Sequence, residues 1–297
     1  MNATTEVFVL FLIMVAGVLS RRLGYLTDDA IHGVTRMVLN IALPCLTIYN
    51  MQREFSYEVF IGFLLSLFGA SVLILLCLAV GWMLFRSRKR PRRLVLSHAM
   101  AFPNCGFMGY PIILAINPDW MIYAVAYNIA YNLIFWSVGV GMYGSGLMDG
   151  LRKTLRNPNF IASILGFVLF CLRFRWPEPI SQTLSLLGGL TTPLTMILIG
   201  TRLVGIHVKE LFLDRDYPIA VVLRLMIIPV AARLFFAPLP APVGVRESLF
   251  LLTAMPIASL VTMQAEVAGG DTVFAARFSA LSTLLSLVTI PVMALLL

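Results

Sequence analysis

The feature that most constrains this chain is a succession of apolar segments, each about 20 residues long. This is the length that a helix needs to cross the hydrocarbon core of a bilayer. Only 12% of the residues are charged, against about 25% in a typical soluble domain. We therefore expect an all-α, multi-pass membrane protein. Ten helices are expected, with approximate limits 5–20, 30–51, 57–85, 94–117, 120–147, 158–175, 180–204, 216–236, 246–269 and 271–296.

Lysine and arginine predict the orientation of these spans. Fourteen of them follow odd-numbered spans and five follow even-numbered spans. Because basic residues collect on the cytoplasmic side, both termini are expected outside the cytoplasm, with the chain in the inner or plasma membrane of the cell. The same rule accounts for the net charge of +8, so no nucleic-acid partner is expected. The basic cluster Arg86–Arg93 has a second interpretation, recognition of anionic lipid, but topology determination is preferred.

Several landmarks recur about 150 residues apart. Pro103 and Pro256 are separated by 153 residues, and the acids Asp119 and Asp271, each at an expected helix start, by 152. The chain is therefore expected to contain two related halves.

The expected halves, 1–155 and 156–297, contain five spans each. Because five is odd, the second half enters the membrane from the opposite side to the first. Inverted repeats of this kind are typical of secondary transporters, whose substrate sites lie near the bilayer midplane between discontinuous helices.

Span four contains an unusual density of helix breakers. Pro103, Gly106, Gly109 and Pro111 fall within nine residues, and each proline removes an amide donor. Non-helical backbone at this depth survives only where it lines a polar cavity or is buried in protein. Span four is therefore expected to split around residues 103–111, and span nine around Pro256, although a simple proline kink is the alternative for span nine. The exposed amides at half-helix N-termini would suit an anion.

Six short motifs, in order along nearly the whole chain, resemble the auxin efflux carrier family. The most specific is the N-x-G-F-x-G-x-P element in span four. The matching stretches are Asn104-Cys-Gly-Phe-Met-Gly-Tyr-Pro111, Leu43-Pro44, Thr192-Pro-Leu-Thr-Met-Ile-Leu-Ile-Gly200, Arg224-Leu-Met-Ile-Ile-Pro229, Ala254-Met-Pro-Ile-Ala258 and Ser282-Thr-Leu-Leu-Ser-Leu-Val-Thr-Ile-Pro291.

This resemblance implies a fold similar to that of sodium/bile-acid symporters, with ten spans as two inverted five-helix repeats. Broken spans four and nine would cross at the midplane, in a transport domain of spans three to five and eight to ten. Spans one, two, six and seven would form a scaffold, through which members form homodimers. Family members carry small organic anions such as carboxylates by alternating access. Because only about ten residues separate spans five and six, the chain resembles a short bacterial-type carrier.

The candidate substrate-binding residues are polar groups and glycines at the interruptions and in span five. Each also has a structural interpretation. Asn104 would cap a half-helix, the asparagines of span five would bond between helices, and serine and threonine would join neighbouring helices, which is preferred for Thr262. The full set is Asn104, Gly106, Gly109, Asn128, Asn132, Ser259 and Thr262.

Four ionisable residues inside or near the ends of spans are candidates for coupling or charge pairing, because such groups are costly in a membrane. Arg224 would bind substrate, pair with a carbonyl at a helix break or extend to the cytoplasm, and structural pairing is preferred. Arg277 raises the same question. His98 would take up a proton or be a hydrogen-bonded structural residue. Glu266 would bind a coupling proton or cation, or be simply solvated. The coupling ion is H+ or Na+, and no other cofactor is expected.

The leading functional hypothesis is a secondary transporter of small organic anions. A membrane receptor or regulatory subunit that binds an anion without moving it is the alternative. An enzyme is not expected, because the aspartates fall in loops or at helix starts, His98 has no acid nearby to orient it and no metal-ligand cluster is present. A phosphate-binding loop is also absent, so ATP-driven transport would require a partner protein.

Overall fold

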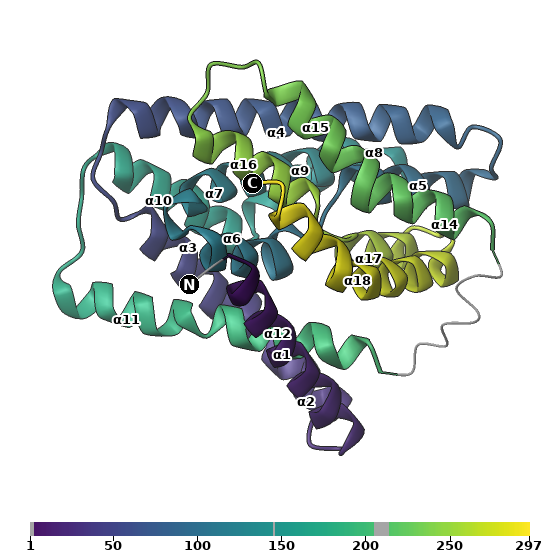
Figure 1. Ribbon diagram of the computed structural model, residues 1–297, viewed down its shortest axis with the longest axis horizontal. Coiled ribbons are helices and arrows are strands. Elements are labelled where there is room, and N and C mark those ends of the chain that lie inside the picture. The colour runs from purple at the N-terminus through teal and green to yellow at the C-terminus, as the bar shows by residue number, and fades with distance from the viewer. Residues whose placement is uncertain (1–2, 145, 205–213) are drawn as a thin grey trace.

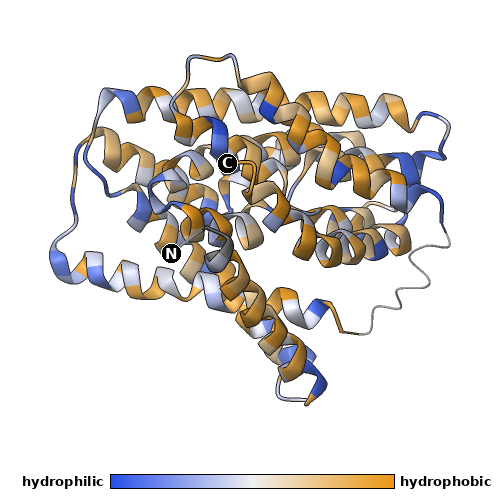
Figure 2. Cartoon of the chain, in the orientation of Figure 1, coloured by the Kyte–Doolittle hydropathy of each residue, from blue (hydrophilic) through white to orange (hydrophobic). Residues whose placement is uncertain are grey.

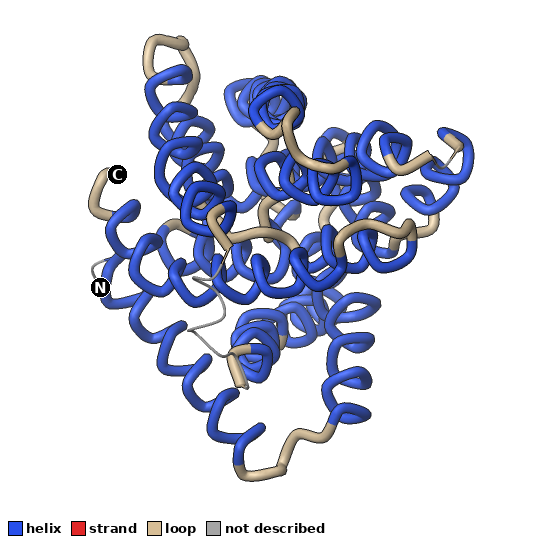
Figure 3. The backbone as a smooth tube through the Cα atoms, turned by 90° about the vertical axis from the view of Figure 1, so that its right-hand side faces the viewer, coloured by secondary structure: helices blue, strands red, loops and turns tan. Residues whose placement is uncertain are grey.

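The computed structural model describes residues 3–144, 146–204 and 214–297, and the regular structure in these residues is entirely helical (Figures 1 and 3). Lys209, one of the charges counted for orientation, lies outside the described residues. In Figure 1, α4 lies along the top of the molecule and α11 along the lower left, and α1 and α2 project below α12.

The first half begins with α1 (Ala3–Arg22), and span two consists of three consecutive segments. They are α2 (Asp28–Met37), the π-helical turn η1 (Val38–Ala42) and α3 (Leu43–Met51). The remaining elements of this half are α4 (Tyr57–Leu84), α5 (Arg90–Ala101), η2 (Cys105–Gly109), α6 (Tyr110–Ile116), η3 (Pro118–Trp120), α7 (Met121–Ile134), η4 (Phe135–Gly139), α8 (Val140–Met142) and α9 (Leu147–Leu155).

The second half follows a similar succession of long and interrupted helices. Its elements are α10 (Pro158–Cys171), α11 (Glu178–Gly189), α12 (Thr191–Arg202), α14 (Asp216–Val222), η5 (Leu223–Ile227), α15 (Ile228–Phe236), α16 (Val243–Thr253), α17 (Ser259–Val267) and α18 (Thr272–Ala294).

Side-chain caps fix several of the helix starts. The hydroxyls of Thr27 and Ser56 accept hydrogen bonds from amides three residues later, and the Asp271 carboxylate accepts one from Phe274 N. Each of these bonds satisfies one of the amides that a helix leaves unpaired at its N-terminus.

The composition of the helices places the chain in a membrane. Hydrophilic residues gather near the loops at the two ends of the molecule, and the helices between are mainly apolar (Figure 2). In the described residues, six helices or continuous helix pairs are long and apolar enough to cross a bilayer, and α9 with α10, bent by 68°, would make a seventh. The helical segments on either side of the two interruptions are each too short to cross a bilayer alone. The multi-pass membrane class is thus confirmed, and the ten-span count stays a prediction.

The helices pack as two groups. In one, α1 packs against α12, and α3 against α10 and α11. A Cβ atom on Gly200 would lie 2.1 Å from the Met14 carbonyl oxygen, and one on Gly17 would lie 2.2 Å from that of Ile197. Only glycine therefore allows α1 and α12 to approach so closely. In the other group, α4 packs against α5 and α7, and α15 against α16.

Three boundaries differ from expectation. The helix in span four is interrupted only at residues 102–104, because the π-helical turn η2, whose Tyr110 N donates to Cys105 O, leads directly into α6 and carries the helix through Pro111. Span five ends at Met142 and is followed by the separate helix α9, and span six ends at Cys171. In span nine the simple kink is wrong, because residues 254–258 leave the helix altogether.

Candidate functional site

The two interruptions meet and pair through their backbones. An isolated antiparallel bridge joins Pro103 to Ile257. Asn104 N donates to Pro256 O at 2.7 Å, and Ala258 N donates to Phe102 O at 3.1 Å. Each unwound segment thus satisfies polar groups of the other, as backbone without water must.

Two prolines explain why the helices unwind at these positions. Pro103 and Pro256 have no amide to continue an α-helical ladder, and each disfavours helical geometry in the residue before it. Phe102 accordingly has φ −112° and ψ 91°. The Ser282 hydroxyl of α18 accepts a hydrogen bond from Ile257 N at 3.3 Å, which supports the second interruption from outside.

Arg224 binds the carbonyl ends of both first half-helices. One Nη atom donates to Met255 O at 2.9 Å and the other to Met100 O at 3.3 Å. The residue is only 1% exposed. Because a helix C-terminus carries partial negative charge, the guanidinium is placed where it stabilises the ends of α5 and α16 together. Of the three alternatives for Arg224, this geometry matches pairing with carbonyls at a helix break.

The second half-helices begin at the same crossing and present their positive ends to it. The Asn104 carbonyl accepts from the amides of Met108 and Gly109. Among the described residues no backbone carbonyl accepts from the amides of Gly106 and Phe107, and the Gly106 amide faces the Cys105 sulfur. In the first turn of α17 the Val261 amide donates to Ala258 O at 3.0 Å, and the amides of Ser259 and Leu260 have no backbone acceptor among the described residues. The N-terminal ends of two half-helices, with amides that lack a backbone acceptor, therefore lie next to the paired strands.

Arg202 adds a full positive charge to this region. It is the last residue of α12, and its guanidinium donates a hydrogen bond to the hydroxyl of Ser259, the first residue of α17. Among the described residues no carboxylate lies within ion-pair distance of Arg202. The sequence gives no sign of this contact, because an arginine at the end of a span is normally a topology signal.

The two glycines of the first crossing segment have different surroundings. A Cβ atom on Gly109 would lie 2.6 Å from a methyl carbon of Leu252, so this glycine allows close packing against α16. On Gly106 the nearest atoms would be 3.9 Å away, the Asn128 Nδ2 and a Leu43 methyl. Gly106 thus leaves open space at the start of the second half-helix.

The two asparagines of span five belong to a buried polar network. The Asn128 carboxamide oxygen accepts from Asn132 at 2.9 Å and Asn159 at 3.2 Å, and its nitrogen donates to the Cys105 sulfur at 3.3 Å. Thr47 donates to Asn159 at 2.8 Å. In this conformation interhelical hydrogen bonds account for these amides, and they connect α3, α7, α10 and η2.

The remaining candidates lie away from the crossing or face other groups. Thr262 donates to Ala275 O of α18 at 3.3 Å. The two His98 ring nitrogens face the Leu94 and Gly139 carbonyls at 2.7 and 3.0 Å. Glu266 and Arg277 lie on exposed faces of α17 and α18. In the described residues no group of three or more histidine, cysteine or acidic side chains would hold a metal ion.

Comparison with known proteins places these features in a family. The family described as membrane transport protein matches residues 2–148 and 147–294, which is nearly the whole chain. An uncharacterised transporter from Methanothermobacter thermautotrophicus is 27% identical over 98% of this chain and 97% of its own length. A second uncharacterised transporter, from Methanocaldococcus jannaschii, is 24% identical over 66% of this chain and 68% of its own. The chain therefore belongs to the membrane transport protein family, the auxin efflux carrier family that its motifs resemble, and is a transporter and not an enzyme.

Proposed function

We propose that the chain is a secondary active transporter of small organic anions, carboxylates in particular, and that the anion binds where α5–α6 and α16–α17 cross. One observation carries the proposal. The two interruptions pair so that their carbonyl ends bind Arg224, while the N-termini of η2–α6 and α17 begin at the same pairing with no arginine or backbone carbonyl satisfying all of their amides.

Charge distribution favours an anion over a cation at this position. The negative ends of α5 and α16 are already neutralised by a buried arginine, and the positive ends of η2–α6 and α17 are not. Arg202 next to Ser259 increases the positive potential. A carboxylate accepts several N–H donors at once and pairs well with a guanidinium. Asn104, whose side chain is only partly buried, would contribute a further donor.

The packing supports alternating access between a scaffold and a moving domain. The helices α1 and α12, which pack closely at Gly17 and Gly200, contact the crossing through a small hydrophobic cluster. This cluster is separate from the main hydrophobic core. Four of the nine buried members of this cluster are methionines: Met14, Met108, Met196 and Met255. Methionine is flexible and adapts to changing neighbours, as an interface between moving parts requires. Ten spans as inverted repeats, with a scaffold of spans one, two, six and seven and a homodimer through it, belong to the same proposal.

The experiment is counterflow of radiolabelled mono- and dicarboxylates in proteoliposomes, with and without sodium and a pH gradient. Arg202→Gln and Ser259→Ala are the test variants. Their matched controls are Arg246→Gln, which alters a guanidinium bound to the Ala237 carbonyl, and Ser71→Ala, which alters a hydroxyl bound within α4. Each lost hydrogen bond to a charged group changes affinity by about 10- to 100-fold, so the half-saturating concentration should rise in the test variants alone.

Three results would contradict the proposal. Unchanged uptake in both test variants would show that the transported anion does not bind at the crossing. Transport of organic cations without carboxylates would reverse the proposed charge preference. Saturable carboxylate binding without any flux would favour a receptor.

A further inference from the structure

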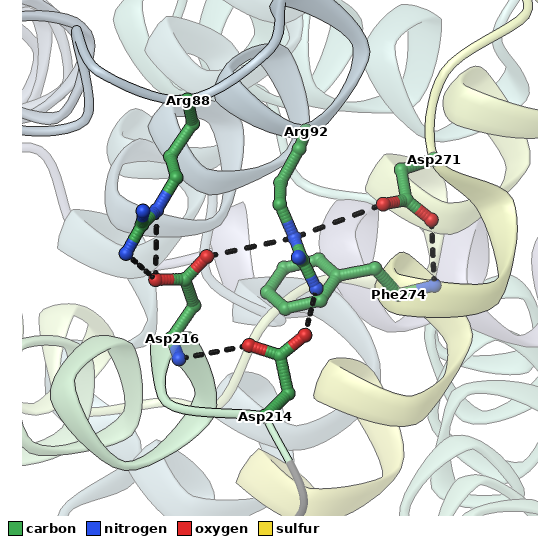
Figure 4. A network of polar contacts seen from close by, with 6 residues as sticks. All are labelled: Arg88, Arg92, Asp214, Asp216, Asp271 and Phe274. Atoms are coloured by element: carbon green, nitrogen blue, oxygen red, sulfur yellow. Dashed lines mark hydrogen bonds and ion pairs between the residues drawn. The ribbon is translucent and has the colours of Figure 1, made fainter.

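The six basic residues of the α4–α5 loop and the start of α5 divide into groups with different surroundings. Arg88 and Arg92 lie against acidic side chains (Figure 4). Arg88 Nε and Nη2 donate to one Asp216 oxygen at 2.9 and 2.6 Å, and Arg92 pairs with Asp214 and lies over the Phe274 ring at 4.2 Å. These contacts join the loop to the starts of α14 and α18.

Arg90 and Arg93 lie in a different environment. The Arg93 guanidinium stacks on the Trp82 ring at 3.6 Å, and its Nε donates to the Trp82 carbonyl at 2.8 Å. Together with Arg88 and Met142 these residues line a cavity of about 580 Å³. Three of the described residues that line it are arginines, and none of them is acidic. Stacking and the Nε bond leave the terminal nitrogens of Arg93 available.

The cavity opens beside an apolar surface. Trp82 lies in the last turn of α4, and tryptophan concentrates at membrane–water interfaces. On the same face of α4, at helical spacing from Trp82, Leu75 and Phe68 are 43% and 70% exposed. A molecule bound by the arginines would therefore have hydrocarbon-compatible surface directly next to its charged group.

We propose that this cavity binds the phosphate of an anionic phospholipid at the membrane interface, with the acyl chains along α4. Arginine forks match phosphate oxygens and form short, charge-assisted hydrogen bonds, and basic cavities between membrane helices accommodate lipid head groups. The adjoining exposed apolar residues favour a phospholipid over free phosphate. The excess of basic residues in this loop places it on the cytoplasmic side, where anionic lipids are abundant. The site is independent of the proposed substrate and of the helix crossing.

The test is quenching of tryptophan fluorescence by brominated phosphatidylglycerol and, separately, brominated phosphatidylcholine, titrated into the detergent-solubilised protein. Trp82→Phe identifies the part of the signal that comes from Trp82. Arg90→Gln/Arg93→Gln is the test variant. Arg86→Gln/Lys89→Gln is the control, because it removes the same charge from the same loop at residues that do not line the cavity. Inorganic phosphate is titrated as a competitor.

We expect phosphatidylglycerol to quench Trp82 at lower concentration than phosphatidylcholine does. The test variant should weaken that preference about tenfold, and the control less than about threefold, because screening reduces the influence of charges that do not contact the lipid. Equal quenching by the two lipids in the unmodified protein would overturn the proposal without reference to any variant. If the two double variants lose the preference for phosphatidylglycerol equally, the preference comes from net charge and not from this cavity, and the proposal is wrong. Displacement of phosphatidylglycerol by phosphate at equal concentration would indicate a site for a soluble anion.

Discussion

Arg224→Met should destabilise the protein far more than the same change at a solvent-accessible arginine. Methionine fills a similar volume but cannot donate to the Met100 and Met255 carbonyls. Two hydrogen bonds from a charged donor contribute about 3–6 kcal/mol together. Removing the charge recovers part of its desolvation cost, which is several kcal/mol for a buried ion, while two buried carbonyls lose their partner. The net loss is about 3 kcal/mol.

A loss of this size lowers the melting temperature of a chain this long by about 6–12 °C. The assay is thermal unfolding in detergent, read by size-exclusion chromatography after heating, and the control is Arg246→Met, whose side chain also donates to one carbonyl. Hydrogen exchange of peptides containing Asn104 and Ala258 should accelerate in the test variant, because these amides donate across the crossing. If Arg224→Met melts within about 2 °C of Arg246→Met, Arg224 does not stabilise the crossing and the reasoning is refuted.

Three further predictions concern packing and charge. Gly200→Ala should cost about 1–3 kcal/mol by forcing α1 from α12, whereas Gly189→Ala, with no atom within 4 Å of the new carbon, should be neutral; equal melting temperatures would contradict this. Burial raises the pKa of Asp214, but the Asp216 amide and the Arg92 guanidinium outweigh it and hold that pKa below 3.8. The resulting stability is present above about pH 4 and lost as the pH falls through the lowered pKa. In Arg92→Gln the folded pKa moves toward the unfolded one, so the acid-dependent loss of melting temperature should be smaller; a loss as large as in the unmodified protein would contradict it. Asn159→Ala should cost about 1–2 kcal/mol in thermal unfolding, and a neutral result would show that the buried amide network does not stabilise the packing.

Local chemistry made the positions of the two interruptions predictable. Pro103 and Pro256 each remove an amide and disfavour helix in the preceding residue, and these effects need no knowledge of neighbours. The extent of the first interruption was overestimated because a π-helical turn directly before Pro111 keeps the helix continuous there. The sequence does not show whether a given proline is accommodated in this way or breaks the helix.

Side-chain contacts between distant helices were less predictable than the positions of the interruptions along the chain. The spacing of Asn128 and Asn132 indicated a shared helix face, but nothing in the sequence identified Asn159, 31 residues from Asn128, as the third member. Arg202 was counted as a topology signal, and its contact with Ser259 depends on how α12 meets α17. Such pairings arise from the arrangement of whole helices and leave no local pattern.

A density map of the protein in lipid nanodiscs, with the carboxylate that is best exchanged in counterflow, tests the central claim most directly. The account predicts that Pro103 and Ile257 pair as antiparallel strands, and that density for the anion lies against the amides of Gly106 and Phe107 and the first turn of α17. Continuous helices through residues 102–104 and 254–258, or an anion bound away from both first turns, would contradict it.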